Sequence, residues 1–318
     1  MTKHMFAGAV TPKGFVDFFD HIMPTEKAKL RYFLKGSSGS GKSTFIKKIA
    51  AAFETSGTDT EKFHCSNDAE SLDALAIPER GICITDATLP HSRDPEIPGA
   101  IDKLIDFAEF IDEKKIICHV DEIKSLMLAK KLQNEKTVAY IAAAGKIFTA
   151  ENKTSDNYAY EQIAEWLKKF RTHDNFIGSN RKLFLSAVTP DGYVSFAEDY
   201  FKDCKVHNLC EEFGTAASSF LIELKNQANA AGISTESFYC PLAPERLDYL
   251  YLPQMKISYA ATDGTLYSGK LFNEVLTAAV DSMQLSKTHH VKLEEIYAST
   301  INFKKVRKLT LATLSALQ

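Results

Sequence analysis

Long hydrophobic runs are absent from this sequence. No apolar stretch approaches the ~20 residues that a membrane-spanning helix needs, so no membrane partner is expected. The N-terminal segment MFAGAV (5–10) is too short to form the apolar core of a signal peptide. Together these observations predict a cytoplasmic protein.

A strong net charge is also lacking. The formal net charge is −3, which gives no reason to expect a nucleic-acid partner. One basic segment, FKKVRK (303–308), lies in a helix-like C-terminal region, and we interpret it as a solvated helix face.

Cysteine pairs of the CxxC type are missing. The six cysteines of the chain are therefore expected to be small buried apolar residues in a reducing compartment. A zinc site in DCKVHNLC (203–210) is the alternative. In a strand, however, Cys204 and Cys210 would face away from His207, which is poor geometry for shared zinc ligation.

What the sequence does contain is an internal repeat. Its 318 residues, 45% of them hydrophobic, are enough for roughly two domains. Matching blocks in the same order are hard to explain except by duplication. The blocks are 6–18 with 184–196 (eight of thirteen positions identical), 33–49 with 209–224 (similar apolar pattern), 63–78 with 238–253 (seven of sixteen), and 85–89 with 262–266 (TDATL and TDGTL).

Each half is predicted to consist of the same α/β units. A short strand leads into a TPxG turn, and an amphipathic helix follows, at 14–23 (GFVDFFDHIM) in the first half and at 192–201 (GYVSFAEDYF) in the second. A strand, a loop and a helix come next, and then strands that end at Cys65 or Cys240 and at Asp86 or Asp263. The alternation predicts two duplicated P-loop NTPase-like lobes with mostly parallel sheets flanked by helices.

The first half carries additional sequence. Extra, largely helical segments such as IDKLIDFAEFIDEKK and YEQIAEWLKKF are predicted as an insertion at about 97–171, interrupted by a polar loop at 151–160. We place the boundary near 173–180. The predicted domains are an intact lobe at 1–178 and a degenerate lobe at 179–318.

The stretch GSSGSGKST (36–44) fits the phosphate-binding pattern G-x-x-x-x-G-K-[ST] in full, between an apolar strand and a helix-compatible segment. Glycines let successive amides curl toward phosphate oxygens, and the helix N-terminus favours the same anion. We predict that Lys42 reaches the β- and γ-phosphates of ATP or GTP and that Ser43 ligates Mg²⁺. The predicted nucleotide-binding residues are Gly36, Ser37, Ser38, Gly39, Ser40, Gly41, Lys42, Ser43 and Thr44.

Further candidates follow the predicted buried strands. Asp86 ends the strand GICITD and is the predicted second magnesium ligand, the alternative being a capping role. His91 is predicted to position water or contact the γ-phosphate, and Arg93 to neutralise transition-state charge, with structural roles as the alternative for both. Asp68, in HCSND, is a candidate base for an acceptor hydroxyl. The predicted catalytic residues are Lys42, Asp86, His91 and Arg93.

The second copy of the loop has lost its phosphate chemistry. Aligned on the following helix, Gly36, Gly41 and Lys42 correspond to Glu211, Ala216 and Ala217, whereas Gly39 and Ser43 keep their types as Gly214 and Ser218. Glu211 and Glu212 would repel phosphates by about 1–4 kcal/mol each. We therefore predict a single nucleotide site and a non-catalytic second lobe.

These motifs together resemble an uncharacterised bacterial family of tandem P-loop ATPases, or predicted nucleotide kinases. The resemblance rests on the duplicated AVTPxG blocks, KGSSGSGKST, FHCSND…LDALAIPE and DATLPHSRDPEIPGA, and it covers nearly the whole length. It implies two P-loop lobes in one chain, nucleotide binding at 36–44, and roles for Asp86 and His91. It implies no particular substrate.

Two functions remain as hypotheses. The first is Mg²⁺-dependent cleavage of ATP or GTP at Lys42, Ser43 and Asp86, with phosphate passing to water or to a small-molecule acceptor. The second is a nucleotide-responsive module whose degenerate second lobe engages a protein partner. Turnover distinguishes them, because a sensor binds nucleotide without appreciable cleavage. A structural protein with a vestigial nucleotide site is the third interpretation, and the intact first loop argues against it.

Overall fold

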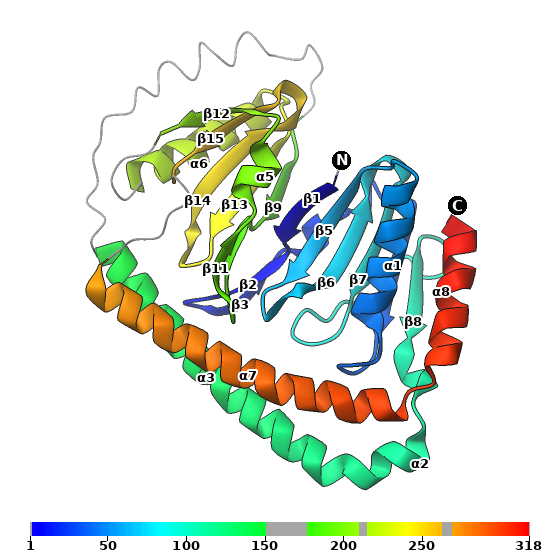
Figure 1. The fold of residues 1–318 in the computed structure, drawn as a ribbon. Helices are drawn as coiled ribbons and strands as arrows, with labels where there is room; N and C mark the ends of the chain where they lie inside the picture. Colours follow the sequence, from blue (N-terminus) through cyan, green and yellow to red (C-terminus); the bar gives the residue numbers. More distant parts are fainter. Residues whose placement is uncertain (1, 151–176, 210–214, 263–268, 318) are drawn as a thin grey trace.

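The computed structural model describes residues 2–150, 177–209, 215–262 and 269–317 (Figure 1). Some predicted features lie outside these residues, so nothing is said of their structure. Among the described residues, no helix combines the length and the apolar character needed to cross a membrane. The predicted features that lie outside the described residues are the polar loop at 151–160, the rest of the insertion to 171, Cys210, Glu211, Glu212, Gly214 and Asp263.

The first sheet contains β1 (Thr2–Phe6), β4 (Leu30–Lys35), β5 (Thr60–Cys65), β6 (Asp68–Ile77), β7 (Ile82–Asp86) and β8 (Asp102–Asp106). Their order in space is β1-β5-β6-β7-β4-β8. Strand β6 runs antiparallel to both neighbours, whereas the other pairs are parallel. The predicted α/β class with helix-flanked sheets is confirmed, but the sheet is mixed, because β6 was not predicted as a strand.

The glycine-rich loop lies between a predicted strand, β4, and a predicted helix, α1 (Lys42–Thr55), and both predictions are confirmed. Phe45, Ile46 and Ile49 are fully buried on the face of α1 that packs against the sheet. Strand β7 is buried from Ile82 to Thr85, as expected of a central strand covered on both faces. This packing fixes the loop at the carboxyl end of β4.

The second sheet repeats the first. It contains β9 (Asn180–Leu183), β12 (Lys205–Asn208), β13 (Thr235–Cys240), β14 (Ala243–Leu252) and β15 (Ile257–Ala260). Their order, β9-β13-β14-β15-β12, and their relative directions correspond to β1-β5-β6-β7-β4. Helix α6 (Thr215–Ala230) packs on this sheet in the position that α1 occupies on the first.

Local irregularities are repeated as well. The pairing register of β5 with β6 shifts at 63–65, and that of β13 with β14 shifts at 238–240. The backbone N–H of Leu72 donates to Ser43 Oγ at 3.0 Å, and the N–H of Leu247 donates to Ser218 Oγ at 2.8 Å. Matching sequence blocks therefore occupy matching places in the two sheets.

The TPxG turns belong to β-hairpins. Strands β2 (Gly8–Thr11) and β3 (Gly14–Asp17) pair antiparallel, as do β10 (Ser186–Thr189) and β11 (Gly192–Ser195). The prediction of a helix at 14–23 is therefore wrong, and at 192–201 only α5 (Ala197–Phe201) is helical. The cause is the turn, in which Gly14 has φ +96° and the Thr11 hydroxyl donates to its carbonyl at 2.9 Å.

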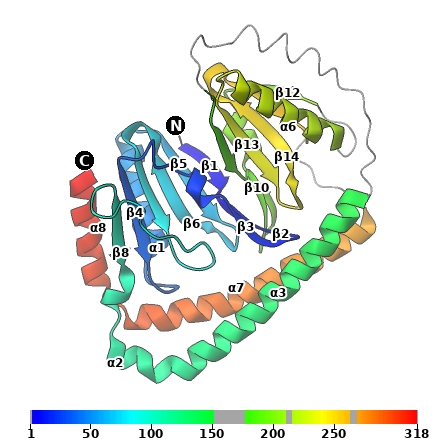
Figure 2. The same ribbon diagram turned by 180° about the vertical axis from the view of Figure 1, so that it is seen from behind.

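The remaining helices form an arm and a C-terminal brace. Helix α3 (Val120–Ala150) and helix α7 (Lys270–Thr300) pack side by side and run from the first lobe to the second, and α8 (Phe303–Leu317) lies against α1 (Figures 1 and 2). The predicted insertion is helical from 113 to 150, but 102–106 is a strand. The short helices are η1 (Phe19–His21), η2 (Pro78–Arg80), η3 (Phe107–Phe110), α2 (Glu113–Ile116), η4 (Ile117–His119) and η5 (Pro253–Met255).

Other sequence predictions have mixed outcomes. The basic segment 303–308 is exposed except at Val306, so the solvated helix face is confirmed. Cys83 and Cys240 are buried as predicted, but Cys65 and Cys204 are only half-buried, and Cys118, in η4, is exposed. Within the described ranges, no group of three or more His, Cys, Asp or Glu side chains is arranged to hold a metal ion.

The two lobes meet through equivalent edge strands. Phe6 and Phe184 exchange backbone hydrogen bonds of 2.9 and 3.0 Å, and each is the counterpart of the other in the repeat. Beside them, the Arg181 guanidinium donates to Glu61 at 2.6 and 3.0 Å and to Glu236 at 3.3 Å. Arg181 therefore joins a carboxylate from each sheet.

Candidate functional site

Backbone geometry requires glycine at three positions of the loop between β4 and α1. Gly36, Gly39 and Gly41 have φ values of +138°, +70° and +97°. A Cβ at Gly36 would lie 2.8 Å from Phe107 Cβ, and one at Gly39 would lie 2.4 Å from the carbonyl oxygen of Glu294. The glycines therefore permit both the turn of the loop and the close approach of α7.

Lys42 lies over this loop and is 7% exposed. Its Nζ donates to the carbonyl oxygens of Gly36 and Ser37 at 2.8 Å each and lies 3.6 Å from Asp86 Oδ2. The lysine thus holds the loop closed while facing the carboxylate that ends β7. A phosphate in the loop would offer the same ammonium group stronger, charged acceptors.

Asp86 and His91 are brought together at the end of β7. Asp86 Oδ1 accepts hydrogen bonds from the Thr88 backbone at 3.0 Å and from the Thr88 hydroxyl at 2.7 Å. The ring of His91 is buried against Phe19, with centroids 4.4 Å apart, and its Nδ1 contacts the Asp86 carbonyl oxygen at 2.9 Å. That contact orients Nε2 toward Asp73 Oδ2, 3.8 Å away.

Arg93 is not brought into the site. Its guanidinium pairs with Asp17 at 2.5 Å and with Asp20 at 2.7 Å, and Arg93 does not line the cavity described below. The hairpin β2–β3, which was predicted as a helix, carries Asp17 to this position. In this arrangement Arg93 holds the segment after His91 against the hairpin.

Asp73, on β6, is a site residue that the sequence analysis did not select. Burial raises its pKa to about 6, an effect that His91 and Lys42 oppose and Asp86 reinforces. The repeat contained one signal for this residue, because Asp73 recurs as Asp248. Burial raises the pKa of Asp248 to about 6 as well. Strand β6 places Asp73 beside β7 and therefore beside the glycine-rich loop.

Asp73→Asn is expected to increase the free energy of unfolding at pH 7.5 by about 1–3 kcal/mol, because it removes a buried charge. The folded pKa lies above the ordinary value of 3.8, so the native state binds the proton more tightly. Stability of the wild type therefore falls as pH rises from about 4 through 6. Chemical denaturation should show a smaller difference in the free energy of unfolding between Asp73→Asn and the wild type at pH 4 than at pH 7.5. An equal difference at both pH values would contradict the raised pKa of Asp73.

Helices α3 and α7 cover the site. Lys287 Nζ lies 2.8 Å from Asp68 Oδ1, and Lys130 Nζ lies 2.8 Å from His290 Nδ1. Burial and the neighbouring Lys130 lower the pKa of His290 to about 4, so the ring is neutral and accepts a hydrogen bond from Lys130. His290 also lies 3.4 Å from the Ser38 hydroxyl. A half-buried lysine of α3 is thereby held near the loop.

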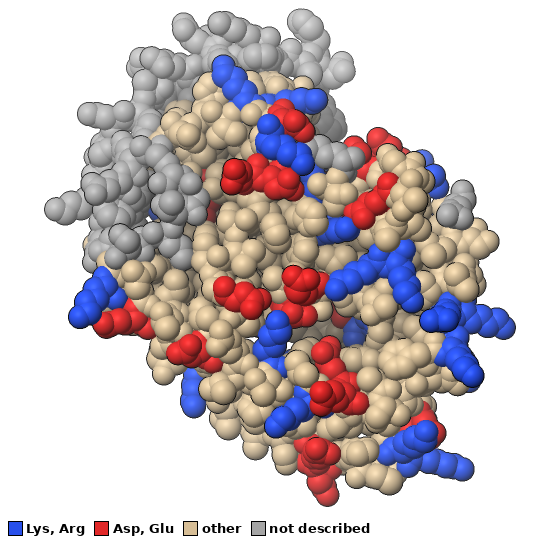
Figure 3. Space-filling model, in the orientation of Figure 1, with Lys and Arg blue, Asp and Glu red and all other residues tan. Residues whose placement is uncertain are grey.

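A cavity of about 510 Å³ lies between the loop, the ends of β6 and β7, and α7. Figure 3 shows acidic and basic side chains around a hollow between the first sheet and α7. The cavity joins residues from segments far apart in the sequence, so it forms only in the folded chain. Its polar lining includes Lys42, Ser43, Asp68, Asp73, Asp86, His91, Lys130, His290 and Glu294.

Comparison of the chain with protein-family models, curated proteins and solved structures gave no match. The function of the chain is therefore inferred from the geometry and chemistry of this cavity.

Proposed function

We propose that the chain binds one Mg²⁺–nucleoside triphosphate, ATP or GTP, at 36–44 and cleaves its γ-phosphate. The observation that carries the proposal is the placement of Lys42 Nζ 3.6 Å from Asp86 Oδ2, across a glycine-rich loop at the start of α1. Triphosphate cleavage requires a cation and a carboxylate beside a helix N-terminus, whose free N–H groups favour an anion.

The proposal includes two duplicated P-loop lobes, of which only the first has kept its phosphate chemistry. Shared strand order, shared register shifts and the paired Ser43–Leu72 and Ser218–Leu247 hydrogen bonds support the duplication. In the second lobe Ala217, fully buried at the start of α6, stands where the first lobe has Lys42. At this position the second lobe therefore lacks the side chain that would contact a terminal phosphate.

The donor set at the site fits Mg²⁺. The Ser43 hydroxyl and the Asp86 carboxylate offer the hard oxygen ligands that Mg²⁺ prefers, and this ion commonly takes only one or two protein ligands beside phosphate and water. Mg²⁺ would supply charge neutralisation on the β- and γ-phosphates. The chain's own groups would bind the phosphates through the loop amides and Lys42.

A buried His91–Asp73 pair is suited to orient the attacking group. Nδ1 of His91 is fixed by the Asp86 carbonyl, and Nε2 faces Asp73 in the cavity, so the imidazole has one defined orientation. In the proposed mechanism His91 positions water or an acceptor hydroxyl, and Asp73 is the neighbouring proton acceptor. Asp73→Asn is then expected to lower cleavage, whereas Asp248→Asn, in the second lobe, is its matched control.

Lys130→Met is expected to reduce the rate of γ-phosphate cleavage by about 10²-fold, with a smaller effect on nucleotide affinity. The reason is that Lys130, on α3, lines the cavity and would stabilise charge on the terminal phosphate. Steady-state kinetics with Mg-ATP measure this effect. Lys131→Met, an exposed neighbour on the same helix, is the control, and equal kinetics for the two variants would remove Lys130 from the mechanism.

A nucleotide-responsive module is the second candidate, and one observation favours it. Helix α7 begins at Lys270, after the last strand of the second sheet, β15, and its Glu294 backbone contacts the loop at Gly39. Nucleotide in the loop would therefore act directly on a helix that reaches the second lobe. Under this hypothesis, ATP changes hydrogen exchange along α7 and a protein partner binds the second lobe without appreciable cleavage.

Calorimetric titration with Mg-ATP and with Mg-GTP tests the binding step. The proposal predicts one site per chain, because only the first loop has a lysine and a full set of glycines. A stoichiometry of two would show that the second lobe binds as well. Failure of both nucleotides to bind would overturn the proposal.

A further inference from the structure

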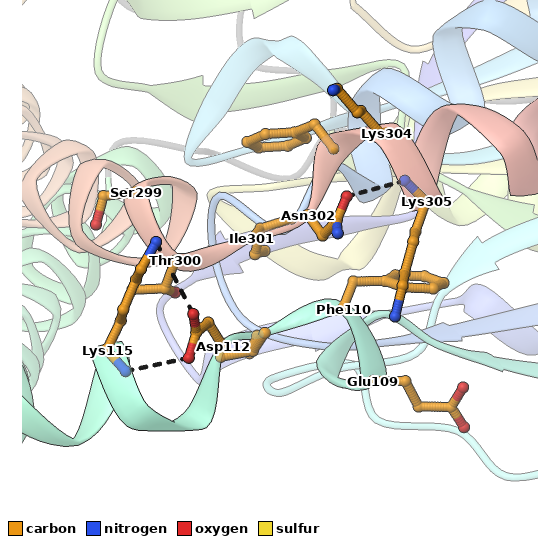
Figure 4. Close-up of a pocket in the computed structure, with 12 residues that line it drawn as sticks. Glu109, Phe110, Asp112, Lys115, Ser299, Thr300, Ile301, Asn302, Lys304 and Lys305 are labelled. Atoms are coloured by element: carbon orange, nitrogen blue, oxygen red, sulfur yellow. Dashed lines mark hydrogen bonds and ion pairs between the residues drawn. The ribbon is translucent and has the colours of Figure 1, made fainter.

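A second cavity, of about 550 Å³, lies where α7 ends and α8 begins. The facing wall is the segment after β8, from Glu109 to Asp112. Figure 4 shows Asn302 at the turn between the two helices, Phe110 on the facing segment, and the Asp112–Lys115 ion pair at one end. Backbone hydrogen bonds from Asp112 to Thr300 and from Asn302 to Phe110 tie the two walls together.

Phe303 connects this cavity to the phosphate site. Its side chain lines both cavities, and the whole residue is 47% exposed. A Cβ placed on Gly41 would lie 3.6 Å from Phe303 Cε1, so the ring lies against the last glycine of the loop. An exposed aromatic ring at this point offers a stacking surface immediately beside the bound phosphates.

The strand order determines which way a nucleoside would extend. Strand β4 lies between β7 and β8. Asp86 lies on the β7 side and faces Lys42. The terminal phosphates and Mg²⁺ would therefore lie at this end of the loop. The sugar and base must extend from the other end, past the start of α1 and toward the carboxyl end of β8. The second cavity begins there, at the segment that follows β8.

The chemistry of the lining suits a purine. Asn302 Oδ1 accepts a hydrogen bond from the Lys305 backbone at 3.2 Å, which leaves the amide Nδ2 as a donor. Purine rings carry acceptor nitrogens on their edges and a large π-face for stacking. The ring of Phe303 and the amide of Asn302 would therefore contact the face and the edge of one base.

We infer that the cavity at the α7–α8 junction is the subsite for the purine nucleoside of the bound triphosphate, with Phe303 stacking on the base. This inference rests on the proposed function, since it extends the same bound molecule. It also assigns a role to the C-terminal helices, because the base is held by residues that follow the second sheet in sequence.

Equilibrium titrations with Mg-ATP and with Mg-tripolyphosphate test the inference in the full chain. Tripolyphosphate lacks the nucleoside and therefore reports the loop alone. Phe303→Ala is expected to weaken ATP binding by about 5- to 100-fold and to leave tripolyphosphate binding unchanged. Phe303→Trp is expected to keep the affinity for ATP, and Leu311→Ala, an exposed apolar truncation on the same helix, to alter neither ligand.

The outcomes separate the two proposals. Wild-type affinity of Phe303→Ala for ATP, or equal loss of both ligands, would overturn the subsite while the nucleotide site stands. If neither Mg-ATP nor Mg-tripolyphosphate binds to the wild type, the proposed function is overturned, and the subsite with it.

Discussion

Lys42→Ala is expected to lower the rate of Mg-ATP cleavage by about 10²- to 10³-fold or more. Lys42 is the cation of the loop, and its Nζ is already held between the Gly36 and Ser37 carbonyls and Asp86. Replacing its weak carbonyl partners by phosphate oxygens would let the ammonium stabilise the charge that develops on the transferred group. Alanine removes that interaction and leaves the Asp86 carboxylate unopposed beside the phosphates.

The matched control is Lys48→Ala, nearly two turns further along α1, where the lysine is exposed and does not line the cavity. Its cleavage rate should stay within about twofold of the wild type. Single-turnover kinetics at saturating nucleotide distinguish loss of chemistry from loss of binding. Equal rates for the two variants would show that cleavage, if present, occurs elsewhere in the chain.

Arg181→Ala is expected to reduce the free energy of unfolding by about 3–5 kcal/mol, because it leaves two buried glutamates without their cation. Burial alone would lower the pKa of Arg181, but Glu61 and Glu236 outweigh it and the pKa is raised. The guanidinium also donates to the carbonyl oxygens of His21 and Ile22, at 2.9 and 3.0 Å. All five N–H groups of an arginine side chain can be used in such a fork, which lysine cannot reproduce.

Lys202→Ala provides the comparison, since Lys202 forms an exposed ion pair with Asp199 at 3.0 Å. Truncation there should change stability by less than about 1 kcal/mol. Chemical denaturation of both variants gives the two values directly, and Arg181→Lys supplies an intermediate if the alanine variant does not fold. A loss below 1 kcal/mol in Arg181→Ala would show that the two lobes do not depend on this contact.

Local sequence was sufficient for the elements around the phosphate loop. Strand β4, helix α1, and the strands ending at Cys65 and Asp86 each have an apolar pattern that matches their environment. Local sequence was not sufficient for the hairpins, because the apolar residues of the run FVDFF fit both the spacing of a helix and the alternation of a strand. Strand β6 was missed because Leu75, Ala76 and Ile77 are buried in succession, without the alternation that marks a half-exposed strand.

Only some residues of the candidate site could be predicted from the sequence. Lys42, Ser43, Asp86 and His91, all selected from the sequence, line one cavity, since they follow two adjacent strands of one sheet. Lys130 and Phe303 reach that cavity from helices far along the chain, and no local pattern marks such tertiary contacts. Arg93 was misplaced for a related reason, because its partner Asp17 belongs to the hairpin that was predicted as a helix.

The most direct test of the account follows the γ-phosphate of labelled Mg-ATP, with the wild type and with Lys42→Ala. Each is assayed alone and with an extract of small metabolites. We predict that the label leaves ATP only with the wild type. Its destination, inorganic phosphate or a small molecule, identifies the acceptor. A label that stays on ATP in every mixture, or that leaves equally with Lys42→Ala, would contradict cleavage at this site.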